Sequence, residues 1–225
     1  LIVGGDSTIH ELIYDAASFP HAVLACIAAG SGNDYARGIQ KIRNVKQITE
    51  LLHVAEQSAI AIDLGQVQAN DEELYFVNSL GLGFDASICK AVNESKRKKH
   101  FQNWKLGKFI YIYYLLRQLF IFKPFPLRIE VDGRKKEYEK AWFIVVANQP
   151  YFGGGLKVAP DASDHDGKFH VIVVNNIPSF LFMFMFVSVF WGGHLKMTKW
   201  VEQFTCKKIH MKTDKEVPIQ ADGEI

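Results

Sequence analysis

The sequence predicts an α/β region followed by an antiparallel β domain. Two strand–glycine turn–helix units occupy the first 40 residues or so, and this order is typical of a parallel α/β sheet. From about residue 59, short apolar runs alternate with hairpin signals such as Asp132-Gly133. The chain has 225 residues and is 48% hydrophobic, which is enough for one large or two small domains. We therefore expect domains at residues 1–58 and 59–225.

The first region begins with three apolar residues, which lead into the glycine motif at residues 4–8 and a helix-like run at 9–17. A second apolar run, 23–28, ends in the turn at 30–34, and helices are expected at 35–39 and 45–55. These units predict a mainly parallel, doubly wound sheet. A strand that feeds a glycine loop normally has partner strands before it. We therefore expect this domain to be incomplete at its N-terminus.

The second region is expected to consist mostly of hairpins. Strands are predicted at 59–64 and 74–78, around a polar loop at 66–73. Further strands are predicted at 128–131, 141–147 and 168–174, with 209–212 and 217–221 as a final pair. Between them, residues 86–122 read as one long helical stretch with a basic centre at 96–100.

Composition excludes some classes of protein. The chain has 26 basic and 24 acidic residues, a balance that argues against a general nucleic-acid binder. Three widely spaced cysteines form no CxxC pair, which fits a reducing cytoplasm. No signal peptide is visible.

The Phe-rich run at 180–191 has only twelve residues, whereas a membrane-spanning helix needs about 20. No transmembrane span is therefore expected. Two interpretations of the run stay open, a buried segment and an apolar surface that meets lipid.

The glycine motif at 4–8 suggests phosphate binding. Gly4 and Gly5 let the backbone approach an anion closely, and the amide N–H groups at a helix start point towards it. Asp6 supplies a hard oxygen ligand suited to Mg²⁺, although a helix-capping carboxylate is the alternative.

Five motifs follow one another in a fixed order, at residues 4–8, 30–38, 78–86, 148–169 and 221–224. This order resembles the diacylglycerol kinase catalytic family, and most closely its bacterial lipid kinases. That group is related to sphingosine and ceramide kinases and, more distantly, to NAD kinase. The motif at 148–169 is the most specific, since NAD kinases lack it.

The resemblance implies a Rossmann-like, NAD kinase-like N-terminal domain and a C-terminal β-sandwich, with the active site in the cleft between them. It also implies an ATP- and Mg²⁺-dependent enzyme that phosphorylates a lipid hydroxyl, with diacylglycerol as the leading substrate. We expect a cytoplasmic protein at the inner face of the membrane, and the relatives suggest a homodimer. A kinase for another hydroxyl lipid or for NAD, and a member that binds lipid or nucleotide without turnover, are the alternatives.

The resemblance also assigns site residues. Glu224 would be the general base, Asp222 would orient it or join a metal network, and Asp6 would take part in that network. The residues expected at ATP are Gly4, Gly5, Asp6, Ser7, Thr8, Ile9, His10, Glu11, Ser31, Asn33 and Asp34. The residues expected at a structural Mg²⁺ are Ser163, Asp166 and, through its carbonyl, Lys168. The plainer alternatives are a helix cap at Asn33 and Asp34, a polar turn at 161–168 and an exposed hairpin turn at Glu224.

Two residues depart from the family pattern. Ser7 stands where Gly is usual, and because serine tolerates positive φ poorly, a strained turn or a shifted loop is expected there. Ser163 replaces an Asp of some relatives and offers only neutral oxygens, which predicts weaker metal binding. The basic run at 96–99, with Lys105 and Lys108, suits an anionic membrane, with a solvated helix face as the alternative.

Overall fold

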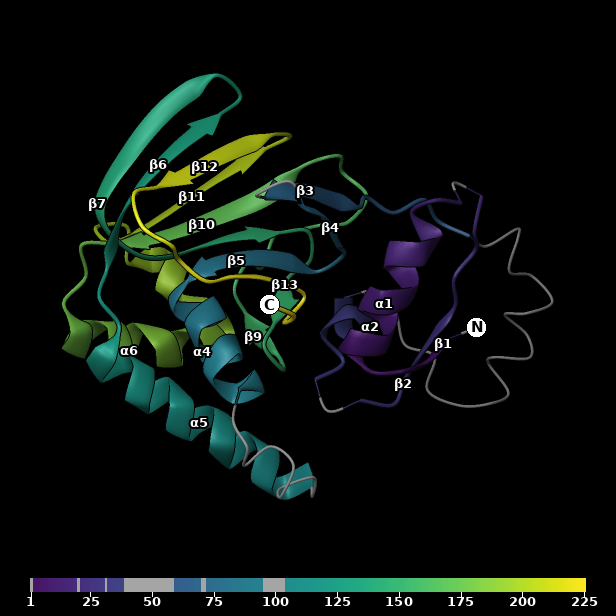
Figure 1. Cartoon of the computed structure of the whole chain (residues 1–225), viewed down its shortest axis with the longest axis horizontal. Coiled ribbons are helices and arrows are strands. Elements are labelled where there is room, and N and C mark those ends of the chain that lie inside the picture. The colour runs from purple at the N-terminus through teal and green to yellow at the C-terminus, as the bar shows by residue number, and fades with distance from the viewer. Residues whose placement is uncertain (1, 20, 31, 39–58, 70–71, 95–103) are drawn as a thin grey trace.

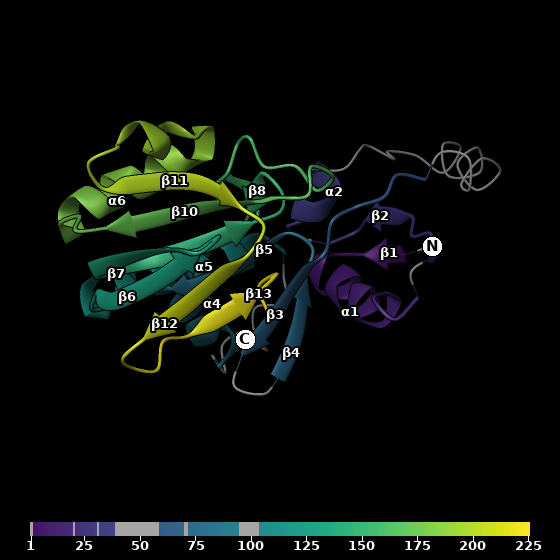
Figure 2. The ribbon, with the colours of Figure 1, turned by 90° about the horizontal axis from the view of Figure 1, so that it is seen from above.

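The computed structural model describes residues 2–19, 21–30, 32–38, 59–69, 72–94 and 104–225. It has a small α/β part at the N-terminus and a large antiparallel sheet with helices along one side (Figure 1). Figure 2 shows the same arrangement from above, with α1, β1 and β2 at one end of the molecule. The α/β and antiparallel β classes predicted from the sequence are both confirmed. The helix expected at 45–55 lies outside the described residues.

The α/β part is built on two parallel strands, β1 (Ile2–Gly4) and β2 (Cys26–Ala28). Helix α1 (Asp6–Ala16) follows the first strand, and the short α2 (Asp34–Gly38) follows the second. Ile9 and Ile13 are one helical turn apart, so both face the same way and are buried against Ile2, Tyr35 and Val77. This small core fixes the start of α1 against both strands.

The main sheet is arranged around one long strand, β7 (Arg134–Ala147). Its first half pairs with β6 and its second half lies between β5 and β10. The other strands of the seven-stranded sheet extend from these neighbours. Besides β7, the sheet therefore contains β5 (Ser79–Gly83), β6 (Phe125–Val131), β10 (Phe169–Asn175), β11 (Val201–Cys206), β12 (Ile209–Thr213) and β13 (Ile219–Ala221).

The second half of β7 is buried on both faces because the sheet separates two hydrophobic cores. Val145 and Ala147 point into one core, and Ile144 and Val146 point into the other, as expected from the two-residue period of a strand. The first core lies under the helices, and the second is enclosed by strands. This layering is the β-sandwich-like architecture predicted for the second region.

Helices cover one face of the sheet (Figure 1). They are α4 (Phe84–Asn93), α5 (Trp104–Ile121), α6 (Ser179–Ser188) and the 3₁₀ turns η2 (Val189–Trp191) and η3 (Gly193–Lys196). The stretch predicted as one helix over 86–122 is thus two helices, and its basic centre at 96–99 lies outside the described residues. In the described part of the chain, no helix has the length and apolarity needed to cross a membrane.

Two strand predictions were wrong in detail. The residues expected to form a polar loop at 66–73 instead supply most of a hairpin, β3 (Gly65–Ala69) and β4 (Glu72–Phe76), and 59–64 forms no strand. In this hairpin Val67 packs against the strand-enclosed core while Gln66 and Gln68 are exposed, the alternation expected of a strand. A further short hairpin consists of β8 (Tyr151–Phe152) and β9 (Leu156–Lys157).

The two C-terminal strands do not pair with each other. β12 pairs with β6, whereas β13 pairs with β5. The sequence shows which residues favour strands, but strand partners are set by contacts between residues far apart in the chain. This pairing matters for the site because it carries the chain end from β13 to the start of β5.

The Phe-rich run at 180–191 is buried on one face only. Phe182, Met185 and Val189 lie in the core, and the Phe182 ring stacks on Trp142 at a centroid distance of 4.3 Å. The buried interpretation therefore holds for one face only, because the other side chains point outwards, and contact with lipid stays a prediction.

We predict that Trp142→Phe lowers the free energy of unfolding by about 2–3 kcal/mol, because it deletes buried area and leaves the Ile177 carbonyl without the indole donor, now at 2.9 Å. Trp191→Phe is the matched control at an exposed site, with an expected change within about 0.5 kcal/mol. Urea unfolding followed by far-UV circular dichroism measures both. Equal effects would show that the buried indole and its hydrogen bond to the Ile177 carbonyl do not stabilise the fold.

Candidate active site

Two glycine turns meet at the start of α1. A Cβ added at Gly5 would lie 2.9 Å from the Gly30 Cα, so the two backbones touch. Helix α1 begins directly after Gly5, and no side chain caps its first N–H groups. These N–H groups and the helix dipole form a site suited to an anion.

Ser7 lies in the first turn of α1 and does not have a positive φ, so the strain expected from a Gly-to-Ser replacement is absent. Its neighbours differ in exposure. Thr8 and Glu11 are exposed, whereas Ile9 is buried in the core and presents no polar side-chain atom to a ligand. Ile9, which was predicted at ATP, therefore packs in the core and holds α1 in position.

The second turn is closed by Asn33, which has φ of 56°. Its side chain accepts a hydrogen bond from Gly30 N at 2.8 Å and donates one to the Gly30 carbonyl at 2.7 Å. Next to it, the Asp34 carboxylate accepts a hydrogen bond from Gly154 N at 2.6 Å. This bond ties the second turn to the 153–155 loop of the β domain. Ser31, also predicted here, lies outside the described residues.

Two carboxylates flank Gly32. A Cβ at this position would lie 2.7 Å from Asp6 Oδ2 and 3.9 Å from Asp34 Oδ2. Burial raises the pKa of Asp34, and the nearby Asp6 charge raises it further. The other Asp34 oxygen, Oδ1, is buried and has no hydrogen-bond partner among the described residues. This donor set is suited to a cation.

The turn at the chain end is held by the Asp222 carboxylate. It accepts hydrogen bonds from three successive backbone N–H groups, of Val77 at 2.9 Å, Asn78 at 2.8 Å and Ser79 at 3.0 Å. His10 of α1 lies on the same carboxylate, with Nδ1 at 3.1 Å, and this hydrogen bond raises the pKa of His10. Nδ1 is the donor, since an ionised carboxylate only accepts.

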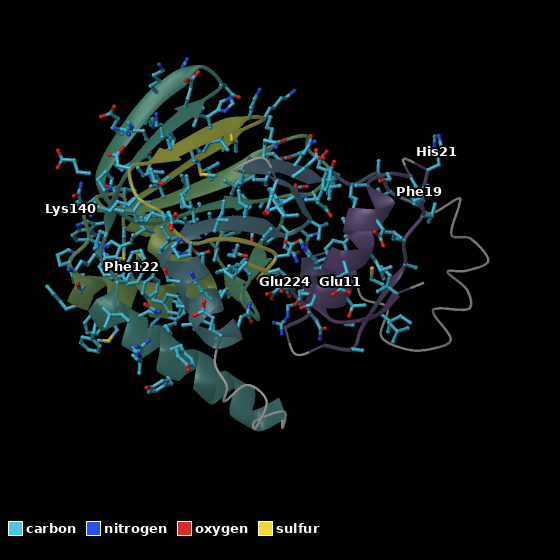
Figure 3. The ribbon with its side chains drawn as sticks, viewed as in Figure 1. Glu11, Phe19, His21, Phe122, Lys140 and Glu224 are labelled. Atoms are coloured by element: carbon cyan, nitrogen blue, oxygen red, sulfur yellow. The ribbon has the colours of Figure 1, made fainter. Side chains whose placement is uncertain are left out.

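Glu224 faces the same helix. Ser7 Oγ donates to Glu224 Oε1 at 2.9 Å, a contact between residues 217 positions apart in the chain. Figure 3 shows Glu224 at the side of the β domain that faces α1. The backbone of Glu224 pairs back onto Ala221, so its position is set by β13. The structure thus brings together residues from both ends of the predicted site.

A buried polar chain supports this turn, and its central residue, Gln220, was not predicted from the sequence. Gly223 N donates to Gln220 Oε1 at 2.6 Å, and Gln220 Nε2 donates to Asp85 Oδ2 at 3.2 Å. Burial raises the pKa of Asp85 to about 6. Gln220 lies in a predicted strand, and its alternation with the apolar Ile219 and Ala221 gives no sign that its polar side chain is buried.

The three residues predicted at a structural metal lie in one loop but are engaged with their neighbours. Ser163 Oγ is 3.1 Å from His165 Nδ1, and Asp166 Oδ1 accepts from Lys168 N at 3.0 Å. Asp63, which was not predicted, accepts from Gly167 N at 2.7 Å and fixes the loop from outside. Among the described residues, no cluster of three His, Cys, Asp or Glu side chains could hold a metal. Metal binding by Ser163, Asp166 and the Lys168 carbonyl stays a prediction.

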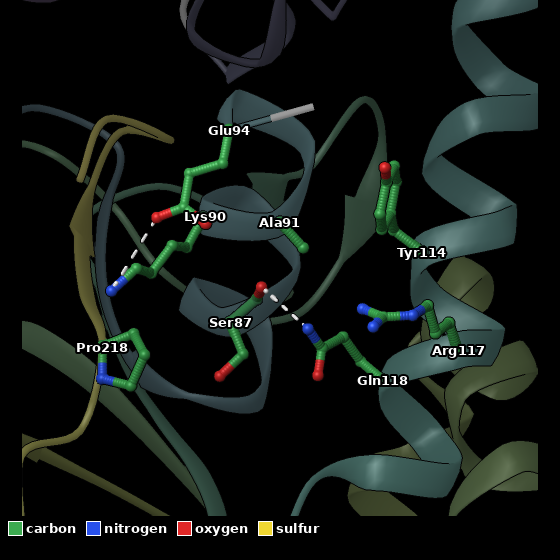
Figure 4. A pocket seen from close by; sticks show the side chains of 8 residues that line it. All are labelled: Ser87, Lys90, Ala91, Glu94, Tyr114, Arg117, Gln118 and Pro218. Atoms are coloured by element: carbon green, nitrogen blue, oxygen red, sulfur yellow. Dashed lines mark hydrogen bonds and ion pairs between the residues drawn. The ribbon is translucent and has the colours of Figure 1, made fainter. Parts of the chain in front are cut away.

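A separate cavity of about 380 Å³ lies between α4 and α5 (Figure 4). Gln118 donates to the Ser87 carbonyl across it, and Lys90 pairs with Glu94 on its wall. None of the glycine-turn residues and no part of 222–224 lines it. This cavity is therefore distinct from the candidate site.

Comparison with known proteins agrees with this geometry. Residues 1–67 match the diacylglycerol kinase catalytic domain, and residues 78–225 match the "YegS C-terminal NAD kinase beta sandwich-like domain". The "Putative lipid kinase YtlR" of Bacillus subtilis (strain 168) is 32% identical over 228 residues, covering 100% of this chain and 73% of that protein.

More distant relatives show the same layout. A "Diacylglycerol kinase" of Mycobacterium tuberculosis (strain ATCC 25618 / H37Rv) is 25% identical over 226 residues, covering 100% of this chain and 69% of its own length. A solved structure, "A putative diacylglycerol kinase from Bacillus anthracis str. Sterne", superposes with a TM-score of 0.67 at 24% identity, over 100% of this chain and 70% of that one. The last likeness supports the fold alone.

The chain belongs to the bacterial lipid kinase family in which a diacylglycerol kinase catalytic domain precedes a YegS-type C-terminal domain.

Proposed function

We propose that this protein transfers the γ-phosphate of ATP to the hydroxyl of a membrane lipid, and that the lipid is diacylglycerol, with phosphatidic acid as the product. The observation that carries the proposal is the contact between Ser7 and Glu224. The Glu224 carboxylate lies beside the uncapped start of α1, where the phosphate would bind. Membership of the kinase family implies ATP use, and the names of the relatives favour diacylglycerol.

The phosphate side of the site would be formed by backbone groups. The uncapped N-terminus of α1 would receive the anion, and the absence of side chains at Gly5 and Gly30 lets the two turns lie against each other beside it. Asn33 holds the second turn in shape through its two bonds to Gly30. Phosphoryl transfer depends mainly on such positioning and on charge neutralisation.

The carboxylates of Asp6 and Asp34 are the residues that fit a divalent cation at this site. They flank Gly32, and Asp34 Oδ1 has no partner among the described residues, so a hard cation would satisfy it. A bound Mg²⁺ neutralises charge on the transferred phosphoryl group. Ser163, Asp166 and the Lys168 carbonyl, in the loop at 161–168, would hold a second, structural cation. To bind it, Ser163 and Asp166 would give up their present hydrogen bonds within the loop.

Glu224 would act as the general base. The lipid hydroxyl oxygen attacks the γ-phosphorus, the bond to the ADP oxygen breaks, and the hydroxyl proton passes to the Glu224 carboxylate. Ser7 holds Oε1 of that carboxylate, and Oε2 takes no part in the bond. Asp222 would act as a positioning residue, because it ties the Glu224 turn to β5 and to α1.

A lipid panel with labelled ATP tests the proposal. Diacylglycerol, ceramide, sphingosine and NAD are offered in mixed micelles or in solution to the folded, Mg²⁺-loaded protein. We expect diacylglycerol to be labelled fastest. Labelling of another lipid or of NAD would replace the substrate, and nucleotide or lipid binding without any labelling would favour a non-catalytic member.

We predict that Glu224→Gln lowers kcat on the preferred lipid by on the order of 10²–10⁴-fold, because an amide cannot take the proton. ATP affinity, measured by calorimetry, should change less than about threefold because the phosphates are held by backbone groups. Glu137→Gln, at an exposed position of β7, is the control and should retain full activity. A loss below tenfold in Glu224→Gln would remove the residue from the role of base.

We predict that the pairing of His10 with Asp222 makes stability depend on pH. Because the folded pKa of His10 is raised, its stabilisation is complete below the unfolded pKa of about 6.5 and is lost as pH rises through the folded pKa. The difference in unfolding free energy between wild type and His10→Gln should shrink by up to about 1 kcal/mol between pH 6 and pH 9. Urea titrations at several pH values measure it, and a difference that grows with pH contradicts the pairing.

A further inference from the structure

Helix α6 is apolar on both sides, yet only one side is covered. Phe180, Phe184 and Val187 are spaced by three or four residues and point outwards, with exposed fractions of 64%, 64% and 52%. The exposed face continues beyond the helix end through Phe190 and Trp191, at 60% and 66%. A helix at the surface of a protein that meets only water normally carries polar residues on its outer face.

Helix α5 extends this surface. It packs beside α6 on the same side of the sheet, and its inner Leu119 lies in the same core as Phe182 (Figure 1). On its outer side Phe120 is 85% exposed, next to the exposed Ile121. We define the apolar face as the side chains of these two segments that are at least half exposed near the α5 end, on α6 and just after it, namely Phe120, Ile121, Phe180, Phe184, Val187, Phe190 and Trp191.

The segments that carry the apolar face contain no acidic residue. Residues 95–129 and 167–201 have no Asp or Glu, although the chain contains 24 of them. Their described, exposed cations include Arg117 and Lys123 beside the α5 end, and Lys196 and Lys199 after η2. Within these two segments every charged side chain beside the apolar face is a cation, which is complementary to an anionic lipid surface with aromatic rings at headgroup level.

We propose that the apolar face inserts into the surface of an anionic bilayer and holds the protein there. The α6 helix has ten residues, too few to cross a bilayer, so it would lie in the membrane plane with its aromatic side chains at the acyl boundary. Arg117, Lys123, Lys196 and Lys199 would contact anionic headgroups. This membrane attachment rests on the proposed function, because a kinase whose substrate is a membrane lipid must meet a bilayer.

Vesicle flotation of the full chain tests the proposal. One set of vesicles contains phosphatidylcholine alone. The other contains phosphatidylcholine with roughly 30% phosphatidylglycerol, which gives it the negative surface of an anionic membrane. We expect the partition coefficient of the wild type to be on the order of tenfold higher on the anionic vesicles. In the variant Phe180→Ser/Phe184→Ser/Trp191→Ser it should fall by at least about tenfold, because three large side chains no longer leave water.

The matched control is Phe19→Ser, which changes an aromatic side chain of equal exposure (66%) far from α6 and should bind vesicles like the wild type. Quenching of tryptophan fluorescence by brominated acyl chains provides a measurement that does not depend on the triple variant folding. We expect quenching in the wild type that is largely lost in Trp191→Phe. Unchanged flotation of the folded triple variant, or no quenching difference, would overturn the proposal.

A second copy of the chain is the competing occupant. If light scattering shows a wild-type dimer that the triple variant abolishes, and the dimer does not float, the face is a dimer interface and the membrane proposal is wrong. Activity separates this proposal from the proposed function. The triple variant should keep wild-type activity on a water-soluble short-chain diacylglycerol and lose it on vesicles. A wild type that floats but phosphorylates nothing would refute the kinase function alone.

Discussion

The carboxylate of Asp222 is the interaction on which the candidate site depends. Asp222 has a positive φ. Its side chain accepts hydrogen bonds from the backbone N–H groups of Val77, Asn78 and Ser79, and from His10. These groups come from the entry to β5 and from α1, so the carboxylate joins the chain end to both parts of the molecule. Charge-assisted hydrogen bonds to an ionised acceptor are about twice as strong as neutral ones. The Glu224 position and the Ser7 contact follow from this junction, whereas the closeness of the two glycine turns follows from the pairing of β1 with β2.

The buried sheet determines where that junction lies. β7 is covered on both faces in its second half, and β5 beside it consists entirely of buried residues. A strand with this much burial cannot shift its register without moving apolar side chains into water. β13 is therefore held against β5, and the turn at 222–224 emerges at one defined place next to α1. The Gln220–Asp85 bond fixes the same turn from inside the sheet.

Sequence analysis succeeded where local rules decide the structure. Glycine turns before helices, the Asp132-Gly133 hairpin and the strand at 168–174 all depend on neighbours close in the chain, and all are confirmed to within a residue or two. It was wrong at Ser7, because the glycine pattern of the family suggested a positive φ, whereas the residue lies inside the first turn of α1. It also missed the partners of β12 and the buried role of Gln220, which depend on contacts between residues far apart in sequence. Site roles for Glu224, Asp6 and the 161–168 loop stay predictions, because geometry shows proximity and not chemistry.

Charge distribution tells more about partners than net charge does in this chain. A formal charge of +2 argues against a general polyanion binder and says nothing about a membrane. The acidic residues are nevertheless absent from 95–129 and 167–201, the two segments that carry the exposed aromatic side chains. Anionic headgroups would repel carboxylates at those positions, whereas a surface that met only water would tolerate them. The same two segments also supply the core beneath the sheet, through Leu119, Phe182 and Met185. One pair of helices thus packs inwards on the sheet that positions the site and outwards on the proposed lipid surface, so the site would be held at a fixed height above the bilayer that contains its substrate.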